Sequence, residues 1–323
     1  MNETIRQIIK FQLKIFGALI SYPLKLKIIL KLYNQLYERL PFFIIKQLVK
    51  YVDIKIPWEN FFWKIILLNK KHIVTKMIKN DIKTWEFALA YKGHSPSLNF
   101  TEKILNEYYS KEVPWVDVGA NLGLRSLLAL SEGRPVFFIE PNQEVNQINI
   151  ERCKLNEFSN YHLLEYGASN NKDKVEFFID TTSYKSSING NNDNDNTHLA
   201  RKEIIYIDSL DNLLREYSQN WETVCIKIDT EGHELNVIDG LKGIINSFSP
   251  TMIVEVDTKD QNLQIFCKKM WDLGYEIYEI RNSYRKKYFN KITKDTIFCN
   301  KTFANDFLLI KDQSLQLIIE SYI

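Results

Sequence analysis

Residues 226–234, with the sequence IKIDTEGHE, gather side chains suited to acid–base chemistry. An apolar run that ends in acids predicts a buried strand whose carboxyl end lies where open α/β sheets bind ligands. Asp229 is the preferred base for removing a proton from a hydroxyl group, with His233 and Glu255 as alternatives. Lys227 should pair with a carboxylate, because burying an unpaired lysine is costly. The competing interpretation is a structural ion-pair cluster in which His233 only caps or packs against a helix.

The segment DVGANLG at residues 117–123 has the composition of a cofactor-binding turn. Its glycines let the backbone approach a ligand between a strand and a helix. The spacing differs from G-x-G-x-x-G, because three residues separate Gly119 from Gly123 and no glycine follows three residues later. The acid before the loop, Asp117, favours a cationic ligand over a pyrophosphate. The loop therefore predicts a site for S-adenosylmethionine, whose methionine end carries an ammonium group.

Two further strand ends complete the predicted cofactor site. Residues 137–141, FFIEP, place Glu140 where such folds bind both ribose hydroxyls. Small residues at 166–169, including Ala168, could lie against an adenine ring, and a turn without a ligand is the alternative. The clustered acids would suit Mg²⁺, but acids are ordinary at this sheet edge, so no metal ligand is assigned.

The elements that must position these residues begin at about residue 99. Short apolar runs alternate there with helical patterns, which is typical of βαβ units and a parallel sheet. Asn99 and Glu102 resemble a capping box that opens a helix through Tyr109. We therefore expect a doubly wound α/β domain over residues 99–323. Its predicted strands cover residues 113–118, 136–139, 161–166, 224–228 and 252–256, with final strands at 275–280 and 307–310.

Residues 1–98 are predicted to form a mainly helical region, because apolar residues recur there three and four positions apart. Basic side chains outnumber acidic ones in its first half. Such a basic face could make peripheral contact with an anionic membrane or bind a partner. The simpler interpretation is a solvated face on helices that pack against the catalytic domain.

Composition limits the class of protein. A chain of 323 residues with 45% hydrophobic residues can bury a large core, and its net charge of +2 does not indicate a nucleic-acid partner. The four cysteines are far apart, so a disulfide framework is not expected and a reducing cytoplasm fits best. The apolar stretch at residues 15–24 is too short to span a membrane. The polar, low-complexity residues 189–196 predict a surface loop.

Four motifs together resemble the FkbM-type methyltransferase family. They are a D-x-G-A-N-x-G loop, an E-P strand end, a K-I-D-x-E-G-x-E strand end and a strand that ends in V-E, in this order. The resemblance implies a Rossmann-like class I methyltransferase sheet and O-methylation of a hydroxyl, commonly on a sugar or a natural product. The cofactor would be S-adenosyl-L-methionine. The expected cofactor-binding residues are Asp117, Gly119, Ala120, Asn121, Gly123, Glu140, Pro141, Ala168 and Asp229.

The leading hypothesis is therefore O-methylation of a sugar in a surface glycan or glycoconjugate, as in polysaccharide biosynthesis. A nicotinamide-dependent oxidoreductase is disfavoured by the loop spacing and by the lack of a Tyr-x-x-x-Lys pair within the sheet domain. A non-catalytic binding module with a vestigial pocket is disfavoured by the intact acids. Nucleic-acid methylation is disfavoured because the Asn-Pro-Pro-Tyr or Asp-Pro-Pro-Tyr signature is absent.

Overall fold

The structure, a computed structural model, describes residues 61–67, 71–77, 96–180, 186–188, 199–256, 262–281, 288–297 and 304–323. The chain divides into two compact units. One unit comprises Met1–Ile66 and Val74–Ser95, and the other comprises Leu67–Ile73 and Pro96–Ile323. The second unit contains all of the predicted site residues.

The N-terminal region differs from the helical expectation where it is described. Strands β1 (Phe61–Ile66) and β2 (His72–Met77) pair with each other, so the prediction of helices is wrong for these residues. Their sequences, FFWKII and HIVTKM, are rich in aromatic and β-branched side chains, which favour strands. The other residues of the predicted helical region before Pro96, and the loop at 189–196, lie outside the described residues. Peripheral membrane contact through the basic N-terminal segment stays a prediction.

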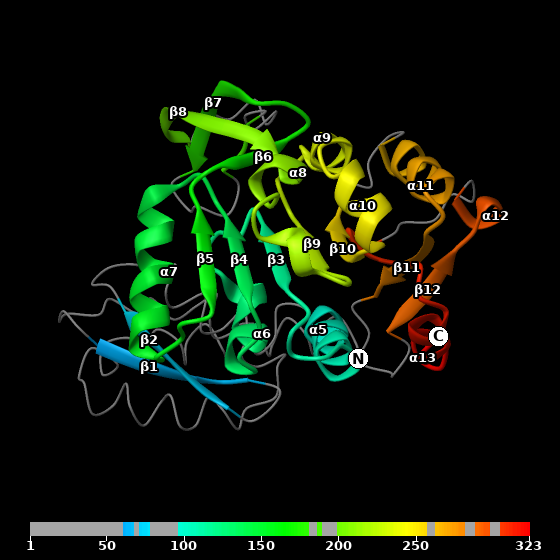
Figure 1. The fold of residues 1–323 in the computed structure, drawn as a ribbon, viewed down its shortest axis with the longest axis horizontal. Helices are drawn as coiled ribbons and strands as arrows, with labels where there is room; N and C mark the ends of the chain where they lie inside the picture. Colours follow the sequence, from blue (N-terminus) through cyan, green and yellow to red (C-terminus); the bar gives the residue numbers. More distant parts are fainter. Residues whose placement is uncertain are drawn as a thin grey trace, which may run out of the picture. The chain divides into compact units, whose positions relative to one another are not determined.

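An eight-stranded sheet forms the centre of the second unit (Figure 1). Its strand order is β12-β11-β13-β10-β9-β3-β4-β5. The five strands from β10 to β5 run parallel, whereas β13, β11 and β12 join by antiparallel pairing. The bounds are β3 (Trp115–Val118), β4 (Val136–Ile139), β5 (Tyr161–Leu164), β9 (Cys225–Ile228), β10 (Thr251–Glu255), β11 (Glu276–Ile280), β12 (Phe289–Ile292) and β13 (Asp306–Ile310). All seven strands predicted for this sheet are present, with ends shifted by at most two residues.

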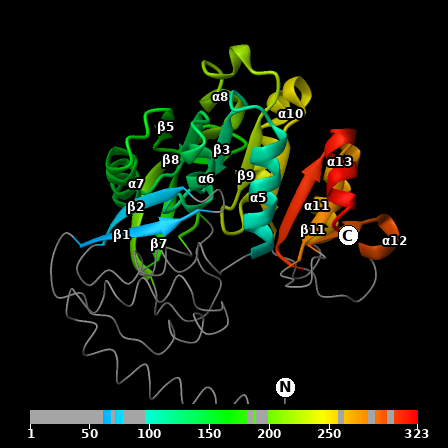
Figure 2. The same ribbon diagram turned by 90° about the horizontal axis from the view of Figure 1, so that it is seen from below.

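Helices cover both faces of this sheet (Figures 1 and 2). Alternate residues of each strand divide between two apolar clusters: Val116 packs with the helices of one face and Trp115 with those of the other. On the Val116 face lie α8 (Leu210–Leu213), α9 (Glu234–Asp239), α10 (Lys242–Phe248) and α11 (Asn262–Asp272). On the Trp115 face lie α5 (Pro96–Tyr108), α6 (Leu127–Ser131), α7 (Gln143–Leu155) and α13 (Gln313–Glu320). The doubly wound α/β prediction is confirmed.

Helix α5 begins three residues before the predicted capping position. Its first residue is Pro96, which suits the first turn of a helix because the missing N–H would have no helical partner there. Asn99 and Glu102 consequently lie within the helix, and both side chains are buried. They make tertiary contacts in place of the predicted capping box.

A second, three-stranded sheet was not predicted. It consists of β6 (Gly167–Ser169), β7 (Asp173–Asp180) and β8 (Leu199–Ser209) in the order β6-β8-β7. Phe177 and Ile179 on β7 pack with Ile205 and Ile207 on β8. The residues that alternate with them on β8 are exposed, with Ile204 at 64% and Tyr206 at 52%, and Phe178 on β7 is half-buried. The sheet therefore has one buried face and one more exposed face. β6 follows β5 after two residues, so Ala168 lies just beyond the carboxyl end of β5.

No helix among the described residues combines the length and the apolar character needed to cross a membrane.

Candidate active site

The glycine loop after β3 lies directly against the chain that leaves β9. Gly119 and Gly123 have φ angles of +71° and +65°, and Asn121 between them has +46°. A Cβ atom on Gly119 would lie 1.9 Å from the backbone oxygen of Asp229. Only glycine permits this approach, so the fold brings the predicted cofactor loop and the predicted acid–base segment together.

Glu140 is buried at the end of β4, with 6% of its surface exposed. One carboxylate oxygen accepts from the backbone N–H of Asn121 at 2.8 Å, and the other accepts from that of Asn142 at 2.9 Å. Burial raises the pKa of Glu140 to about 7, although both hydrogen bonds favour the charged form. Each oxygen keeps a second lone pair for a ligand. Pro141 follows directly, and Asn142 caps α7.

Strand alternation and register place charged residues on one face of the sheet edge. Asp117 on β3 is the register partner of Lys227 on β9, and Asp229 follows two residues later. Glu255 at the end of β10 is the register partner of Asp306 on β13. This is the face that α5 covers. Asp306 was not among the predicted site residues, because its proximity to Glu255 depends on the antiparallel pairing of two strands distant in sequence.

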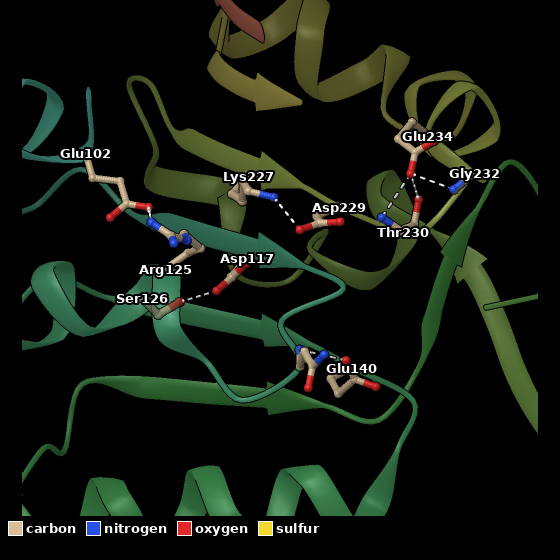
Figure 3. A network of polar contacts seen from close by, with 11 residues as sticks. Glu102, Asp117, Arg125, Ser126, Glu140, Lys227, Asp229, Thr230, Gly232 and Glu234 are labelled. Carbon is tan, nitrogen blue, oxygen red and sulfur yellow. Dashed lines mark hydrogen bonds and ion pairs between the residues drawn. The ribbon is translucent and has the colours of Figure 1, made fainter. Parts of the chain in front are cut away.

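Lys227 and Asp229 form an ion pair with 2.9 Å between Nζ and Oδ2 (Figure 3). The Lys227 side chain is 2% exposed and that of Asp229 is 32% exposed. Burial disfavours the charge on Lys227, but the nearby carboxylates of Asp229, Asp306 and Glu255 outweigh it and raise the pKa of the lysine. The expectation that Lys227 meets a carboxylate is confirmed.

Asp229 and Glu255 respond in opposite directions to this environment. Burial opposes the charge on Asp229, but Lys227 holds its pKa below the usual value. The charge of Asp229, followed by burial, raises the pKa of Glu255 to about 9. At neutral pH the two carboxyl groups therefore share one proton, which resides on Glu255.

Asp117 on β3 is buried, with 2% of its surface exposed. Its Oδ2 accepts a hydrogen bond from Ser126 Oγ at 2.7 Å. Burial raises the pKa of Asp117 to about 6, against the hydrogen bond from Ser126 and the charge of Lys227. A cationic ligand group at this carboxylate would further favour its ionised form.

Arg125 is a site residue that the sequence analysis missed. It lies in the short helix η2 (Leu124–Ser126), directly after the glycine loop. Its Nη1 donates to Asn99 Oδ1 at 2.6 Å and to Glu102 Oε1 at 3.2 Å. The charge of Arg125 also acts on Asp117 and Asp229. No local pattern indicated this pairing, since α5 and η2 meet only in the folded chain.

His233 is held away from solvent at the start of α9. Its Nε2 is 3.0 Å from Ser169 Oγ, its Nδ1 is 3.1 Å from Asn236 Nδ2, and the residue is 8% exposed. Burial lowers its pKa. These contacts support the packing interpretation, because both ring nitrogens have partners outside the carboxylate cluster. They also tie α9 to β6, where Ala168 lies buried beside Ser169.

Glu234 fixes the turn that follows Asp229 (Figure 3). Its Oε1 accepts hydrogen bonds from the N–H of Thr230, the hydroxyl of Thr230 and the N–H of Gly232, each at 3.0 Å. Glu231 and Gly232 have positive φ angles of +53° and +100° in this turn. The second acid of the E-G-x-E sequence thus orders the loop that carries Asp229.

Over the part of the chain that the structure describes, no group of three or more histidine, cysteine, aspartate or glutamate residues is arranged to hold a metal ion.

Residues 117–280 match the family described as the methyltransferase FkbM domain. The chain belongs to this family. The match runs from Asp117 in β3 to Ile280 at the end of β11, so it includes the glycine loop, Glu140, Asp229 and Glu255. The family and the sheet order make the protein an S-adenosylmethionine-dependent methyltransferase of the class I, Rossmann-like fold, as the resemblance implied.

Solved structures similar to this methyltransferase share little sequence with it. A methyltransferase FkbM from Methylobacillus flagellatus is 16% identical, with a TM-score of 0.42 over 71% of this chain, which spans only 53% of that structure. A precorrin-6y C5,15-methyltransferase from Geobacter metallireducens is 13% identical, with a TM-score of 0.37 over 66% of this chain and 88% of its own. A putative methyltransferase from Streptococcus mutans in complex with SAH is 9% identical, with a TM-score of 0.38 over 67% and 98%. The comparison with curated proteins finds no match.

Proposed function

We propose that this methyltransferase transfers a methyl group from S-adenosylmethionine to a sugar hydroxyl in a surface glycan or glycoconjugate. The observation that carries the proposal is the ionised Asp229, which pairs with Lys227 at 2.9 Å. The backbone of Asp229 lies against Gly119 of the glycine loop. Methylation of a hydroxyl requires the acceptor oxygen to be aligned with the methyl group and its proton to be removed. A partly exposed carboxylate beside the cofactor loop suits both tasks.

The cofactor-side residues fit S-adenosylmethionine, which supplies the transferable methyl group when bound. The close approach at Gly119 holds the glycine loop against the segment that follows β9, and Glu140 has lone pairs for two ribose hydroxyls. Asp117 would face the methionine ammonium, directly or through water. The position of Ala168 beside the site supports a contact with adenine.

On the acceptor side, Asp229 would receive the hydroxyl proton, and Lys227 would hold the Asp229 carboxylate in place. Glu255, protonated at neutral pH, can donate a hydrogen bond to another sugar hydroxyl. His233 would act through Ser169 and the position of α9, as a positioning residue. We infer that sugars suit this edge because they offer adjacent hydroxyls to a cluster of carboxyl groups.

The proposal is tested by incubating the full chain with methyl-tritiated S-adenosylmethionine and a panel of sugars, nucleotide sugars and glycan extracts. We expect label in a sugar, in a form that resists mild alkali, because methyl ethers survive conditions that cleave methyl esters. Label released by mild alkali, or recovered as a methylated amine, would contradict O-methylation of a hydroxyl. Binding of nicotinamide cofactors in place of S-adenosylmethionine would contradict the cofactor assignment.

Replacing Glu140 with Gln should weaken binding of S-adenosylhomocysteine and flatten its pH dependence. In the wild type, the pKa near 7 means that binding below pH 7 must first remove a proton, so affinity should fall by up to about tenfold per pH unit. At pH 8, the lost charge-assisted hydrogen bonds should cost about 1.5–3 kcal/mol each. Calorimetric titrations at pH 6, 7 and 8 measure both effects.

The matched control is Glu165→Gln, which removes an exposed carboxylate just beyond β5. Its affinity and pH profile should match the wild type. Between pH 7 and pH 6 a smaller dependence of affinity on pH should persist in Glu140→Gln, because Asp117 has a pKa of about 6. An unchanged affinity in Glu140→Gln at pH 8 would remove this residue from the cofactor site.

A further inference from the structure

Helix α5 lies outside the residues matched by the family, yet its buried polar side faces the cofactor loop. Asn99 is 3% exposed and Glu102 is 1% exposed, and both contact Arg125. Arg125 keeps 13% of its side chain exposed. The helix thus holds a guanidinium group at the rim of the loop, as Figure 3 shows for Glu102 and Arg125.

The geometry of Glu102 indicates that it serves the position of Arg125. Only Oε1 faces the guanidinium, and within the described part of the chain the buried Oε2 has no hydrogen-bond partner. Burial raises the pKa of Glu102 to about 7 despite the nearby arginine. A buried carboxylate satisfied on one side contributes little to stability, so a role in orienting Arg125 is the simpler account of its presence.

Lys227 and Arg125 have different surroundings. The Lys227 side chain is 2% exposed and forms an ion pair with Asp229. Arg125 is more exposed and lies within electrostatic reach of Asp117, the acid assigned to the methionine ammonium. The methionine end of the cofactor carries an ammonium and a carboxylate on one carbon atom. Its pocket therefore needs an anionic and a cationic side chain side by side. Asp117 and Arg125 provide that pair.

We propose that Arg125, oriented by Asn99 and Glu102 of α5, binds the carboxylate of the methionine portion of the cofactor. A guanidinium presents several N–H donors in one plane, which matches the two oxygens of a carboxylate. The inference rests on the proposed cofactor site and extends it to a helix that precedes the family motifs. The competing account is that Arg125 only joins α5 to the loop.

Two ligands separate these accounts: S-adenosylmethionine and its decarboxylated form, which keeps the ammonium and the sulfonium but lacks the carboxylate. In the full chain, Arg125→Met should lower the affinity for S-adenosylmethionine by about 10- to 100-fold. The affinity for decarboxylated S-adenosylmethionine should fall by less than about threefold. Calorimetry measures both, and the thermal unfolding midpoint reports loss of structure. Glu102→Gln should weaken S-adenosylmethionine by a smaller factor in the same selective way.

A matched control is Arg281→Met, which breaks another arginine–glutamate contact, at 3.1 Å to the buried Glu279 of β11. It should leave the ratio of the two affinities unchanged. If Arg125→Met is too unstable to measure, Arg125→Lys keeps the charge but loses the planar fork, and should weaken only S-adenosylmethionine.

Equal weakening of both ligands by Arg125→Met, or of neither, would overturn the assignment and leave Arg125 as a structural link. The proposed function fails in a different way. If the wild type binds neither ligand, the cofactor site itself is misplaced and both proposals fall. If the wild type binds both ligands and Arg125→Met does not discriminate between them, only the role of Arg125 is lost.

Discussion

Gly119→Ala should abolish detectable binding of S-adenosylhomocysteine and lower the free energy of unfolding by about 3–5 kcal/mol. The added Cβ would lie 1.9 Å from the backbone oxygen of Asp229, and φ at this position is +71°. Both the clash and the backbone conformation oppose any side chain. Because the obstacle is backbone, relief requires the loop to move away from β9, which would open the cofactor cradle. Urea unfolding and calorimetry measure the two losses.

Gly133→Ala is the matched control for this substitution. Gly133 has a similar φ of +82°, but a Cβ atom there would meet nothing within 4 Å. It should cost only the conformational strain, about 1 kcal/mol, and leave cofactor affinity unchanged. Equal effects of the two substitutions would mean that the close approach of the loop and β9 does not matter for the cofactor.

Asp229→Asn should reduce turnover by about 10²- to 10⁴-fold, the usual consequence of removing a general base. The amide keeps the size of the side chain but cannot accept the hydroxyl proton or balance Lys227. Affinity for S-adenosylhomocysteine should change by no more than a few fold, because the cofactor contacts proposed above come from Asp117, Glu140, Ala168 and Arg125 and not from the Asp229 side chain. Single-turnover rates and calorimetry on the same preparation separate the two quantities.

Asp239→Asn supplies the control for losing an ion pair with lysine. Its side chain is 31% exposed, against 32% for Asp229, and it contacts Lys242 and Lys269 at the end of α9. Turnover should match the wild type. Normal turnover in Asp229→Asn would shift the role of base to Glu255, whose pKa should fall once the charge of Asp229 is gone. A double variant, Asp229→Asn with Glu255→Gln, tests whether Glu255 has taken over as the base, because turnover should then be lost.

The local sequence was sufficient to predict the parallel part of the fold and the positions of its ligand-binding ends. Each of these strands is a short apolar run that ends in an acid or a glycine, as at Asp117, Glu140 and Asp229. Parallel strands joined by helices must place their carboxyl ends along one edge. The order of motifs therefore predicted that the ligand-binding residues lie along one edge of the sheet.

Tertiary structure alone decided the contacts between segments that share no local pattern. Arg125 pairs with Glu102 because α5 packs on the sheet face that carries Asp117. Nothing in the sequence of α5 or of the segment after the glycine loop specifies this packing. Asp306 lies opposite Glu255 because β13 inserts antiparallel beside β10.

The same limit applies to protonation and to His233. An acid in a sequence has no defined pKa until burial and neighbours are known, so Glu140 and Glu255 could be located but not assigned charges. His233 follows Asp229 closely along the chain, yet the turn directs its ring to Ser169. Strand ends and glycine spacing are short-range properties that the sequence determined. Side-chain environments depend on packing between distant segments, and only the folded chain brings those together.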